Sequence, residues 1–330
     1  MRLTSSGIEQ VLLSSNRFRT LHPSVASLVA VFLAMLAASV CAVQTMARPQ
    51  GQTSKATSRD EDFADDKEPC PGGRKKTGEA RFGEYTVRTY RYPNSYGCFV
   101  ISRGGLAVYE ETSVDFQIGG SPSLALEGKQ DELAPIGTDV TGLGRPDLVI
   151  GEWTGGAHCC FLFHVFELGS DRLRKVTTID AEHSDGSRFE DVDHDGRIEF
   201  LSNDWTFAYW RTGFGQSPAP DVILRFRDGK FRFALDSMHK PSPSDEDLAA
   251  RAMKIAGNWD TLEQGPPHEY WGELLDLIYT GNARRAWSFA EEAWPHDKQG
   301  RGEFIKEFRK QLRKSPHWRE LKELNGQDLK

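Results

Sequence analysis

The sequence has no excess of positive charge. Its 48 Asp and Glu residues outnumber its 41 Lys and Arg residues, which gives a formal net charge of −7 over 330 residues. Proteins that bind nucleic acid need a basic patch or stripe to neutralise phosphates, and this sequence has no broad basic region. We therefore set nucleic acid aside as a partner.

Long apolar runs are absent except near the start of the chain. Residues 25–43, VASLVAVFLAMLAASVCAV, carry no charge, follow several arginines and end in small residues, which is the layout of a secretory signal. Cleavage after Ala42 or Ala47 suits the small-residue requirement. Because the run approaches the roughly 20 residues of a membrane span, an uncleaved single-pass anchor is the alternative. In both cases the preceding arginines favour an extracytoplasmic location, periplasmic or secreted, for the rest of the chain.

Cysteine is scarce, with 5 residues in the whole chain. Cys41 lies in the targeting segment, which leaves Cys70, Cys98, Cys159 and Cys160 as disulfide candidates. An even number of cysteines in an oxidising compartment indicates disulfides. Adjacent residues on a strand point to opposite faces, so we expect at least one long-range bridge, with Cys98 as the favoured partner of the adjacent pair. A disulfide between the two neighbouring cysteines is the alternative.

Familiar catalytic motifs are also absent from the sequence. It contains no G-x-S-x-G nucleophile elbow, no zinc-protease helix motif and no phosphate-binding glycine loop. Asp180, His183 and Asp185 lie close together in DAEHSDG, but polar loops of this kind are common without catalysis. These observations favour a non-enzymatic protein.

Composition divides the chain into four parts. Residues 1–47 form the signal peptide or membrane anchor, and residues 48–78 are polar and mixed in charge, as in a disordered linker. Residues 79–237 contain short alternating runs separated by turns, and residues 238–330 contain apolar residues at a helical period. The sequence therefore predicts a β domain followed by a small helical domain.

The fold class follows from the order of these elements. In VILRFRDGKFRFAL, Asp228 and Gly229 supply a tight turn between two alternating runs, which predicts a β-hairpin. Strands follow one another after short turns without a helical period between them. We therefore expect a mainly β fold built as an antiparallel meander, either partly propeller-like or a sandwich, with a C-terminal α segment. Ser244 is the predicted N-cap of a helix in that segment.

An internal repeat lies within the β region. Residues 139–153 read DVTGLGRPDLVIGEW, and residues 191–205 read DVDHDGRIEFLSNDW. The two stretches share an aspartate, a glycine, an arginine, an acidic residue and a tryptophan in the same order and spacing. Because the match includes Trp153 and Trp205, chance is a poor explanation, and we interpret the stretches as two copies of one unit.

The second copy has the chemistry of a cation site. Carboxylates at alternate positions, Asp191, Asp193 and Asp195, converge on one point when the loop turns sharply, and Gly196 permits that turn. Glu199 supplies a fourth carboxylate. Hard oxygen ligands in this number suit Ca²⁺ better than Mg²⁺, which requires a tighter octahedron. An acidic surface turn without an ion is the alternative, although carboxylates this close repel one another.

The first copy lacks the same set of ligands. Thr141 and Leu143 replace two of the aspartates, and the leucine side chain has no ligand atom. Asp139 and Asp147 remain, which is too few carboxylates for a comparable site. We expect this copy to keep the loop shape without strong metal binding.

Both copies resemble the FG-GAP (integrin-type, VCBS-like) repeat, in which an Asp-x-Asp/Asn-x-Asp-Gly-x-x-Asp loop precedes an apolar strand. The two units cover about 135–165 and 187–206. The resemblance implies a calcium-binding β fold related to propeller blades. It implies that the metal ligands are Asp191, Asp193, Asp195, Arg197 through its backbone carbonyl, and Glu199. The sequence departs from the family in two ways. Glu199 is longer than the aspartate of the family motif, and only two units are recognisable, whereas a closed propeller has about 4–8 blades.

A second cluster of polar residues occurs in GGAHCCFLFH at 155–164. On a strand, His158, Cys160 and His164 share a face and form a candidate zinc site. However, Leu162 interrupts that face, the spacing matches no recognised zinc signature, and export favours oxidised cysteine. We therefore expect bridged cysteines here, and histidines that lie on the strand surface or serve packing.

The preferred function is an exported, non-enzymatic binding or interaction module with a structural Ca²⁺ site. Its partner is a protein or a carbohydrate that the sequence does not identify, and it contacts a membrane only through an uncleaved N-terminal segment. One alternative is a metal-dependent envelope hydrolase that uses His158, His164 or His183 near the acidic loop at 191–199. Another is a membrane-tethered structural protein.

Overall fold

The computed structural model describes residues 70, 74–93, 96–122, 134–157, 159–259 and 265–329. The predicted targeting segment 1–47, most of the predicted linker 48–78, and His158 lie outside the described residues. All the described residues belong to one compact unit.

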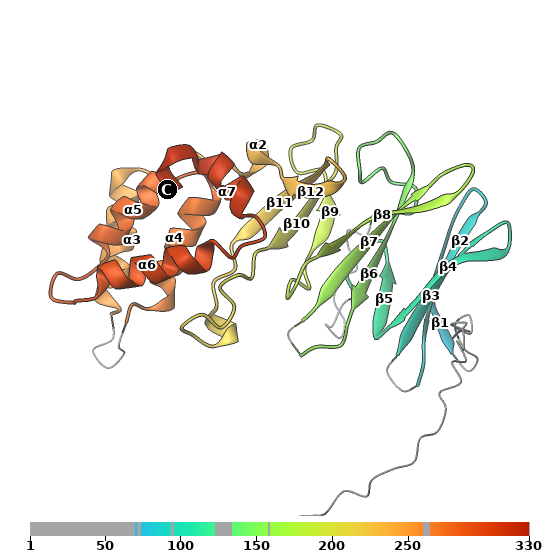
Figure 1. The fold of residues 1–330 in the computed structure, drawn as a ribbon, viewed down its shortest axis with the longest axis horizontal. Helices are drawn as coiled ribbons and strands as arrows, with labels where there is room; N and C mark the ends of the chain where they lie inside the picture. The colour runs from blue at the N-terminus through green and yellow to red at the C-terminus, as the bar shows by residue number, and fades with distance from the viewer. Residues whose placement is uncertain are drawn as a thin grey trace, which may run out of the picture. The chain divides into compact units, whose positions relative to one another are not determined.

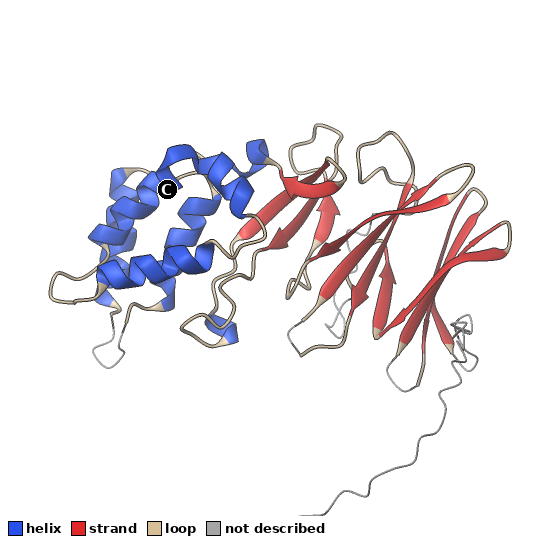
Figure 2. Cartoon of the chain, in the orientation of Figure 1, coloured by secondary structure: helices blue, strands red, loops and turns tan. Residues whose placement is uncertain are grey.

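The strands form three four-stranded antiparallel sheets, and within each sheet the neighbouring strands follow chain order (Figures 1 and 2). The N-terminal sheet contains β1 (Lys75–Phe82), β2 (Tyr85–Arg91), β3 (Gly97–Arg103) and β4 (Leu106–Ser113). The central sheet contains β5 (Asp115–Ile118), β6 (Asp147–Trp153), β7 (Phe161–Leu168) and β8 (Leu173–Asp180). The C-terminal sheet contains β9 (Arg188–Glu190), β10 (Glu199–Asn203), β11 (Asp221–Arg227) and β12 (Lys230–Phe233). None of the three closes on itself, and the predicted antiparallel meander is confirmed.

Helices follow the strands, as the sequence predicts. They are α2 (Leu235–Met238), α3 (Asp245–Gly257), α4 (His268–Tyr279), α5 (Ala283–Glu292), α6 (Arg301–Leu312) and α7 (Trp318–Asn325), with the short 3-10 turns η1 (Phe214–Gln216) and η2 (Gly326–Leu329). The hydroxyl of Ser244 accepts a hydrogen bond from the backbone N–H of Asp247 at 3.1 Å, so the predicted N-cap of α3 is confirmed. No helix in the described ranges has the length and apolar content needed to cross a membrane.

The first strand extends into the segment predicted to be a linker. β1 begins at Lys75, and its first two lysines pair with Arg91 and Tyr90 of β2. Most side chains of β1 are exposed. An edge strand of this kind is held by backbone hydrogen bonds and needs few apolar side chains. Composition alone therefore does not distinguish its start from a disordered segment.

The two middle strands of the central sheet, β6 and β7, are buried on both faces. In β6, Leu148 and Ile150 pack in the core shared with the N-terminal sheet, whereas Val149 packs in the core shared with the C-terminal sheet. In β7, Phe166 and Phe163 divide between the same two cores. Because successive side chains on a strand point to opposite faces, a strand covered on both sides has an almost continuous apolar sequence. Figure 1 shows β5–β8 between the other two sheets.

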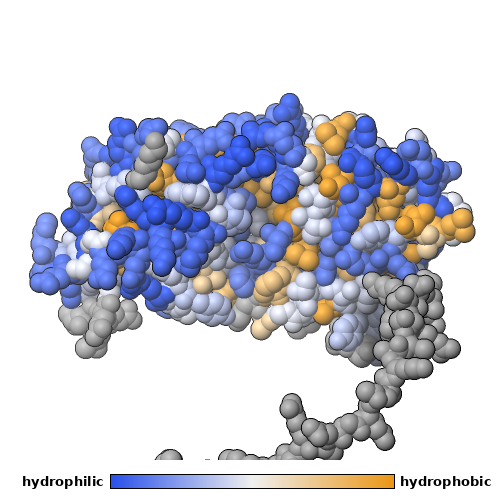
Figure 3. Space-filling view, viewed as in Figure 1, coloured by the Kyte–Doolittle hydropathy of each residue, from blue (hydrophilic) through white to orange (hydrophobic). Residues whose placement is uncertain are grey.

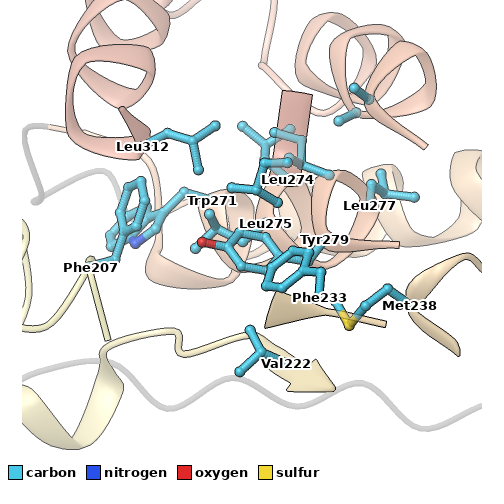
Figure 4. Close-up of a cluster of buried hydrophobic side chains, with 14 of the residues drawn as sticks. Phe207, Val222, Phe233, Met238, Trp271, Leu274, Leu275, Leu277, Tyr279 and Leu312 are labelled. Atoms are coloured by element: carbon cyan, nitrogen blue, oxygen red, sulfur yellow. The ribbon is translucent and has the colours of Figure 1, made fainter. Parts of the chain in front are cut away.

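The helices share a hydrophobic core with the C-terminal sheet. Phe233 of β12 and Tyr279 of α4 have ring centroids 6.1 Å apart, and Figure 4 shows them beside Val222 and Leu275. The same buried cluster continues into the face of the central sheet that contains Phe163. Over the helices, the face of the molecule in Figure 3 is mainly hydrophilic. The helical segment thus buries its apolar side chains against the β region.

The four cysteines of the described residues form two disulfides, Cys70–Cys98 and Cys159–Cys160. The expected bridge from Cys98 to the adjacent pair is therefore wrong. Phe99 of β3 packs toward the central sheet, so the neighbouring Cys98 points to the opposite face, away from the adjacent cysteines that precede β7. Both disulfides are compatible with an oxidising, extracytoplasmic location.

Candidate functional site

The two copies of the repeat occupy equivalent positions in successive sheets. Residues 139–146, the first-copy loop, precede β6, and residues 191–198, the acidic loop, precede β10. The acidic loop joins the first strand of its sheet, β9, to the second, β10, and the first-copy loop is the end of the longer connection from β5 to β6. The repetition in the sequence therefore coincides with a repetition of the fold.

The acidic loop is curled by its own backbone. His194 and Gly196 have φ angles of 59° and 84°, in the left-handed region that glycine adopts most easily. This turn brings the N–H groups of Asp195 and Gly196 to the carboxylate of Asp191, at 3.1 and 3.0 Å. An aspartate that binds backbone N–H groups a few residues ahead fixes a tight turn. These hydrogen bonds within the loop hold it in its curled form.

The curl gathers three of the predicted ligands. One carboxylate oxygen from each of Asp191, Asp193 and Asp195 lies within 4.8 Å of the others. Asp193 accepts a hydrogen bond from the N–H of Asp195 at 3.2 Å, and Asp195 accepts one from the N–H of Arg197 at 2.8 Å. Oxygen ligands at 2.3–2.6 Å from one Ca²⁺ ion are at most about 5 Å apart. The spacing of the three carboxylates therefore fits that ion.

Glu199 lies apart from these three aspartates. It is the first residue of β10 and is 0% exposed. Its carboxylate accepts hydrogen bonds from the N–H of Val192 at 3.0 Å and from Nε of Arg225 at 2.6 Å. A fully buried carboxylate needs a partner of opposite charge, and Arg225 of β11 supplies it. Glu199, a predicted ligand, therefore pairs with an arginine and does not belong to the cluster formed by the three aspartates.

Arg225 is the site residue that the sequence analysis missed. Besides Glu199, its guanidinium contacts Asp193 at 2.9 Å, Asp195 at 3.7 Å and Asp236 at 3.3 Å. Burial tends to lower the pKa of Arg225, but the carboxylates of Glu199 and Asp193 outweigh this effect and raise it. Arg225 remains charged and neutralises part of the acidic loop.

The first-copy loop has the same backbone arrangement without the same carboxylates. Asp139 accepts hydrogen bonds from the N–H groups of Leu143 and Gly144, at 3.1 and 2.7 Å. Gly144 has a φ angle of 72°, and the Leu143 side chain is 49% exposed. The prediction that this copy keeps the loop shape is confirmed.

A buried carboxylate remains in the first copy. Asp147 is 1% exposed, and its Oδ2 accepts hydrogen bonds from the N–H and hydroxyl of Thr141, at 3.0 and 2.8 Å. Its Oδ1 has no hydrogen-bond partner among the residues that the structure describes. Burial raises the pKa of Asp147 from 3.8 to about 6, although the hydrogen bonds from Thr141 act in the opposite direction.

The raised pKa of Asp147 predicts that the unfolding free energy depends on pH. Its pKa is higher in the folded state than in the unfolded state, so its contribution is fully present below about pH 4 and is lost as the pH rises through 6. Relative to Asp147→Asn, we expect the wild type to lose up to about 3 kcal/mol of unfolding free energy between pH 4 and pH 7. Urea denaturation at several pH values measures this difference. Equal pH slopes in the two proteins would contradict the assignment.

His164 and His183, the two described histidines of the hydrolase alternative, do not join the carboxylates of the acidic loop. His164 lies between the N-terminal and central sheets and binds Glu152 at 2.6 Å. His183 packs edge-on against Trp205 and Phe214, with ring centroids 5.3 and 5.1 Å away. Cys160 is in a disulfide, as the sequence analysis expects, and so is not a ligand of the candidate zinc site. His164 and His183 thus have separate surroundings, and neither belongs to the group of carboxylates in the acidic loop.

Several clefts in the described part of the chain offer space for a ligand. A cleft of about 1000 Å³ lies beside the first-copy loop, and its lining includes four arginines: Arg103, Arg145, Arg172 and Arg174. The carboxylate of Glu167 binds Arg145 and Arg174 there, at 2.7 and 2.6 Å. Another cleft, of about 510 Å³, is lined by residues of the C-terminal sheet and of α3 and α4.

Comparisons of the chain with protein-family models, with curated proteins and with solved structures give no match. The assignment of the two copies to the FG-GAP class therefore stays a prediction. It depends on the aligned residues and on the equivalent positions of the two loops.

Proposed function

We propose that this chain is an exported, non-enzymatic binding or interaction module of the FG-GAP type, with a structural Ca²⁺ ion in its acidic loop. The observation that carries the proposal is the convergence of Asp191, Asp193 and Asp195 within 4.8 Å on one curled loop. Because hydrogen bonds already order this loop, an ion binds with little further loss of conformational freedom.

The donor set supports Ca²⁺ rather than a transition metal. All three gathered ligands are carboxylates, and the remaining ligands would be the backbone carbonyl of Arg197 and water, which are also oxygen donors. Arg225 contacts both Glu199 and Asp193, and a doubly charged ion would offset most of the negative charge that is left on the three aspartates. The ion stabilises the loop that joins β9 to β10 and takes no part in a reaction.

The partner is a protein or a carbohydrate, and we place its binding region at the arginine-lined cleft. The first-copy loop forms part of this cleft through Arg145 and Pro146. Loops held by a rigid scaffold are common positions for binding residues. The two copies then have separate roles, because one supports ligand binding and the other holds the scaffold with its ion.

The calcium proposal predicts a thermal shift. At 1 mM Ca²⁺, a site with a dissociation constant of about 10⁻⁴–10⁻³ M adds about 0.4–1.4 kcal/mol, which raises Tm by about 1–6 °C. We expect Asp193→Ala to remove the shift and the exposed-loop control Asp185→Ala to retain it. Differential scanning fluorimetry with Ca²⁺ and with a chelator measures both. An unchanged Tm in the wild type would exclude the ion.

The proposed location predicts the start of the mature chain. If the segment 25–43 is a cleaved signal, mass spectrometry of protein from the cell envelope or medium finds an N-terminus near Val43 or Arg48. Recovery of the intact N-terminus in the membrane fraction would instead establish the single-pass anchor and support the tethered structural protein.

A further inference from the structure

A polar cluster lies at the edge of the apolar interface between the N-terminal and central sheets. It consists of Glu111 on β4, Glu152 on β6 and His164 on β7. The side chains of His164 and Glu152 are only 3% and 8% exposed, and that of Glu111 is 32% exposed. The cluster is therefore buried on one side and open to solvent on the other.

The three side chains direct one nitrogen and two carboxylates toward a common point. One ligand atom from each of Glu111, Glu152 and His164 lies within 4.8 Å of the others. The closest pair is Nε2 of His164 and Oε2 of Glu152, at 2.6 Å. On the other side of the ring, Nδ1 of His164 is 3.1 Å from the hydroxyl of Thr178 on β8.

The contact with Thr178 is the arrangement that metal-binding histidines use. Such histidines commonly donate the second ring N–H to a neighbouring oxygen, which fixes the ring and leaves the other nitrogen free to bind a metal. In the metal-free arrangement Nε2–H donates to the Glu152 carboxylate, and Nδ1 accepts from the hydroxyl of Thr178. Metal binding moves the ring proton to Nδ1, which then donates to Thr178 and leaves the lone pair of Nε2 for the ion. The ring is held in place because His164 lies in the middle of β7, opposite Ile150 of β6.

We propose that Glu111, Glu152 and His164 bind a divalent transition-metal ion of the Zn²⁺ class. Imidazole nitrogen together with carboxylate oxygen suits Zn²⁺ and its neighbours in the periodic table, whereas Ca²⁺ takes oxygen ligands. In a tetrahedral zinc site the ligand atoms are about 3.3 Å apart, so the pair at 2.6 Å opens by less than about 1 Å.

Metal binding replaces the hydrogen bonds that now satisfy the Glu111 carboxylate. Oε2 of Glu111 accepts hydrogen bonds from the hydroxyl of Tyr109 at 2.7 Å and from Lys175 at 3.4 Å. The Lys175 side chain is 31% exposed, so its ammonium group can move into solvent when the ion enters from the side of Glu111. This site differs from the acidic loop in sheet, in ligand residues and in donor chemistry, and it does not rest on the calcium proposal.

The test uses Co²⁺ as a spectroscopic probe for Zn²⁺ on the full chain with its disulfides intact. The background variant Asp193→Asn weakens metal binding by the acidic loop, so the Co²⁺ absorption that remains reports binding at other sites. We expect one equivalent of Co²⁺ with the visible absorption of nitrogen–oxygen coordination, displaced by Zn²⁺ and not by Ca²⁺. His164→Ala and Glu111→Gln each lower the affinity at least about 10-fold.

The matched control is Glu110→Gln, the neighbouring residue on β4, whose side chain points to the opposite face. It leaves Co²⁺ binding unchanged. Because Glu111 is the most exposed ligand, Glu111→Gln decides the question even where His164→Ala fails to fold. Absence of Co²⁺ binding in the background variant, or equal binding in the Glu111→Gln variant, would overturn the proposal.

Discussion

Replacing Arg225 with leucine is expected to lower the unfolding free energy by about 3–5 kcal/mol. Glu199 is 0% exposed, and Arg225 is the cation that contacts it, at 2.6 Å. Removal of one member of a buried pair leaves the other charge buried without compensation, which is strongly destabilising. Chemical denaturation at neutral pH in the presence of chelator measures the change.

Arg188→Leu is the matched control. Arg188 and Glu190 also form an arginine–glutamate contact in the C-terminal sheet, but their side chains are 42% and 41% exposed. An exposed pair contributes at most about 1 kcal/mol. If Arg225→Leu destabilised the protein no more than Arg188→Leu, the buried contact with Glu199 would not have the role assigned to it.

Arg225 also affects the proposed ion. Its guanidinium lies 2.9 Å from Asp193 and 3.7 Å from Asp195, both of which belong to the gathered carboxylates. A cation at this distance competes electrostatically with Ca²⁺ for the same oxygens. We therefore expect the Ca²⁺-induced rise in Tm to be larger in Arg225→Leu than in the wild type, although the variant starts from a lower Tm.

Asp204→Ala is expected to destabilise the protein by about 3–5 kcal/mol, because Asp204 joins the β region to the helices. It is 3% exposed, and its Oδ2 accepts hydrogen bonds from the hydroxyls of Tyr279 and Ser315, at 2.6 and 2.5 Å. Hydrogen bonds to a charged group contribute about 1.5–3 kcal/mol each, and the variant leaves both buried hydroxyls without this partner.

Two further variants separate this effect from a general loss of an acidic residue. Tyr279→Phe removes one of the two bonds and is expected to cost about 1.5–3 kcal/mol. Asp221→Ala removes an exposed aspartate that accepts a hydrogen bond from Asn203 at 2.9 Å, and its effect stays below about 1 kcal/mol. Urea denaturation that ranks Asp204→Ala level with Asp221→Ala would show that Asp204 does not hold the helices in place.

Local signals in the sequence predicted much of the fold. Asp228 and Gly229, with φ angles of 53° and 80°, form the turn between β11 and β12 as their residue types predict. Ser244 caps α3, and the apolar period locates the helices. Each of these features depends on residues close together in the chain. Patterns of this length are visible in one sequence because the backbone geometry of turns and caps selects the residues.

The candidate site was only partly predictable, because several of its contacts join residues that are far apart in the chain. The three aspartates are close in sequence, and the curl of a short loop brings them together. The contact between Glu199 and Arg225 depends on the pairing of β10 with β11, and no local pattern specifies that pairing. The approach of Glu111 to Glu152 and His164 depends on the packing of two sheets. Cys98 pairs with Cys70 because of the face on which its side chain lies, which composition does not reveal.

The measurement that tests the central claim most directly is a crystal structure of the chain grown with millimolar Ca²⁺, with anomalous diffraction used to locate the ion. The account predicts one ion bound by oxygens of Asp191, Asp193 and Asp195 at about 2.3–2.6 Å, with Glu199 still in contact with Arg225. Ordered density for the acidic loop without an anomalous peak among these carboxylates would contradict it.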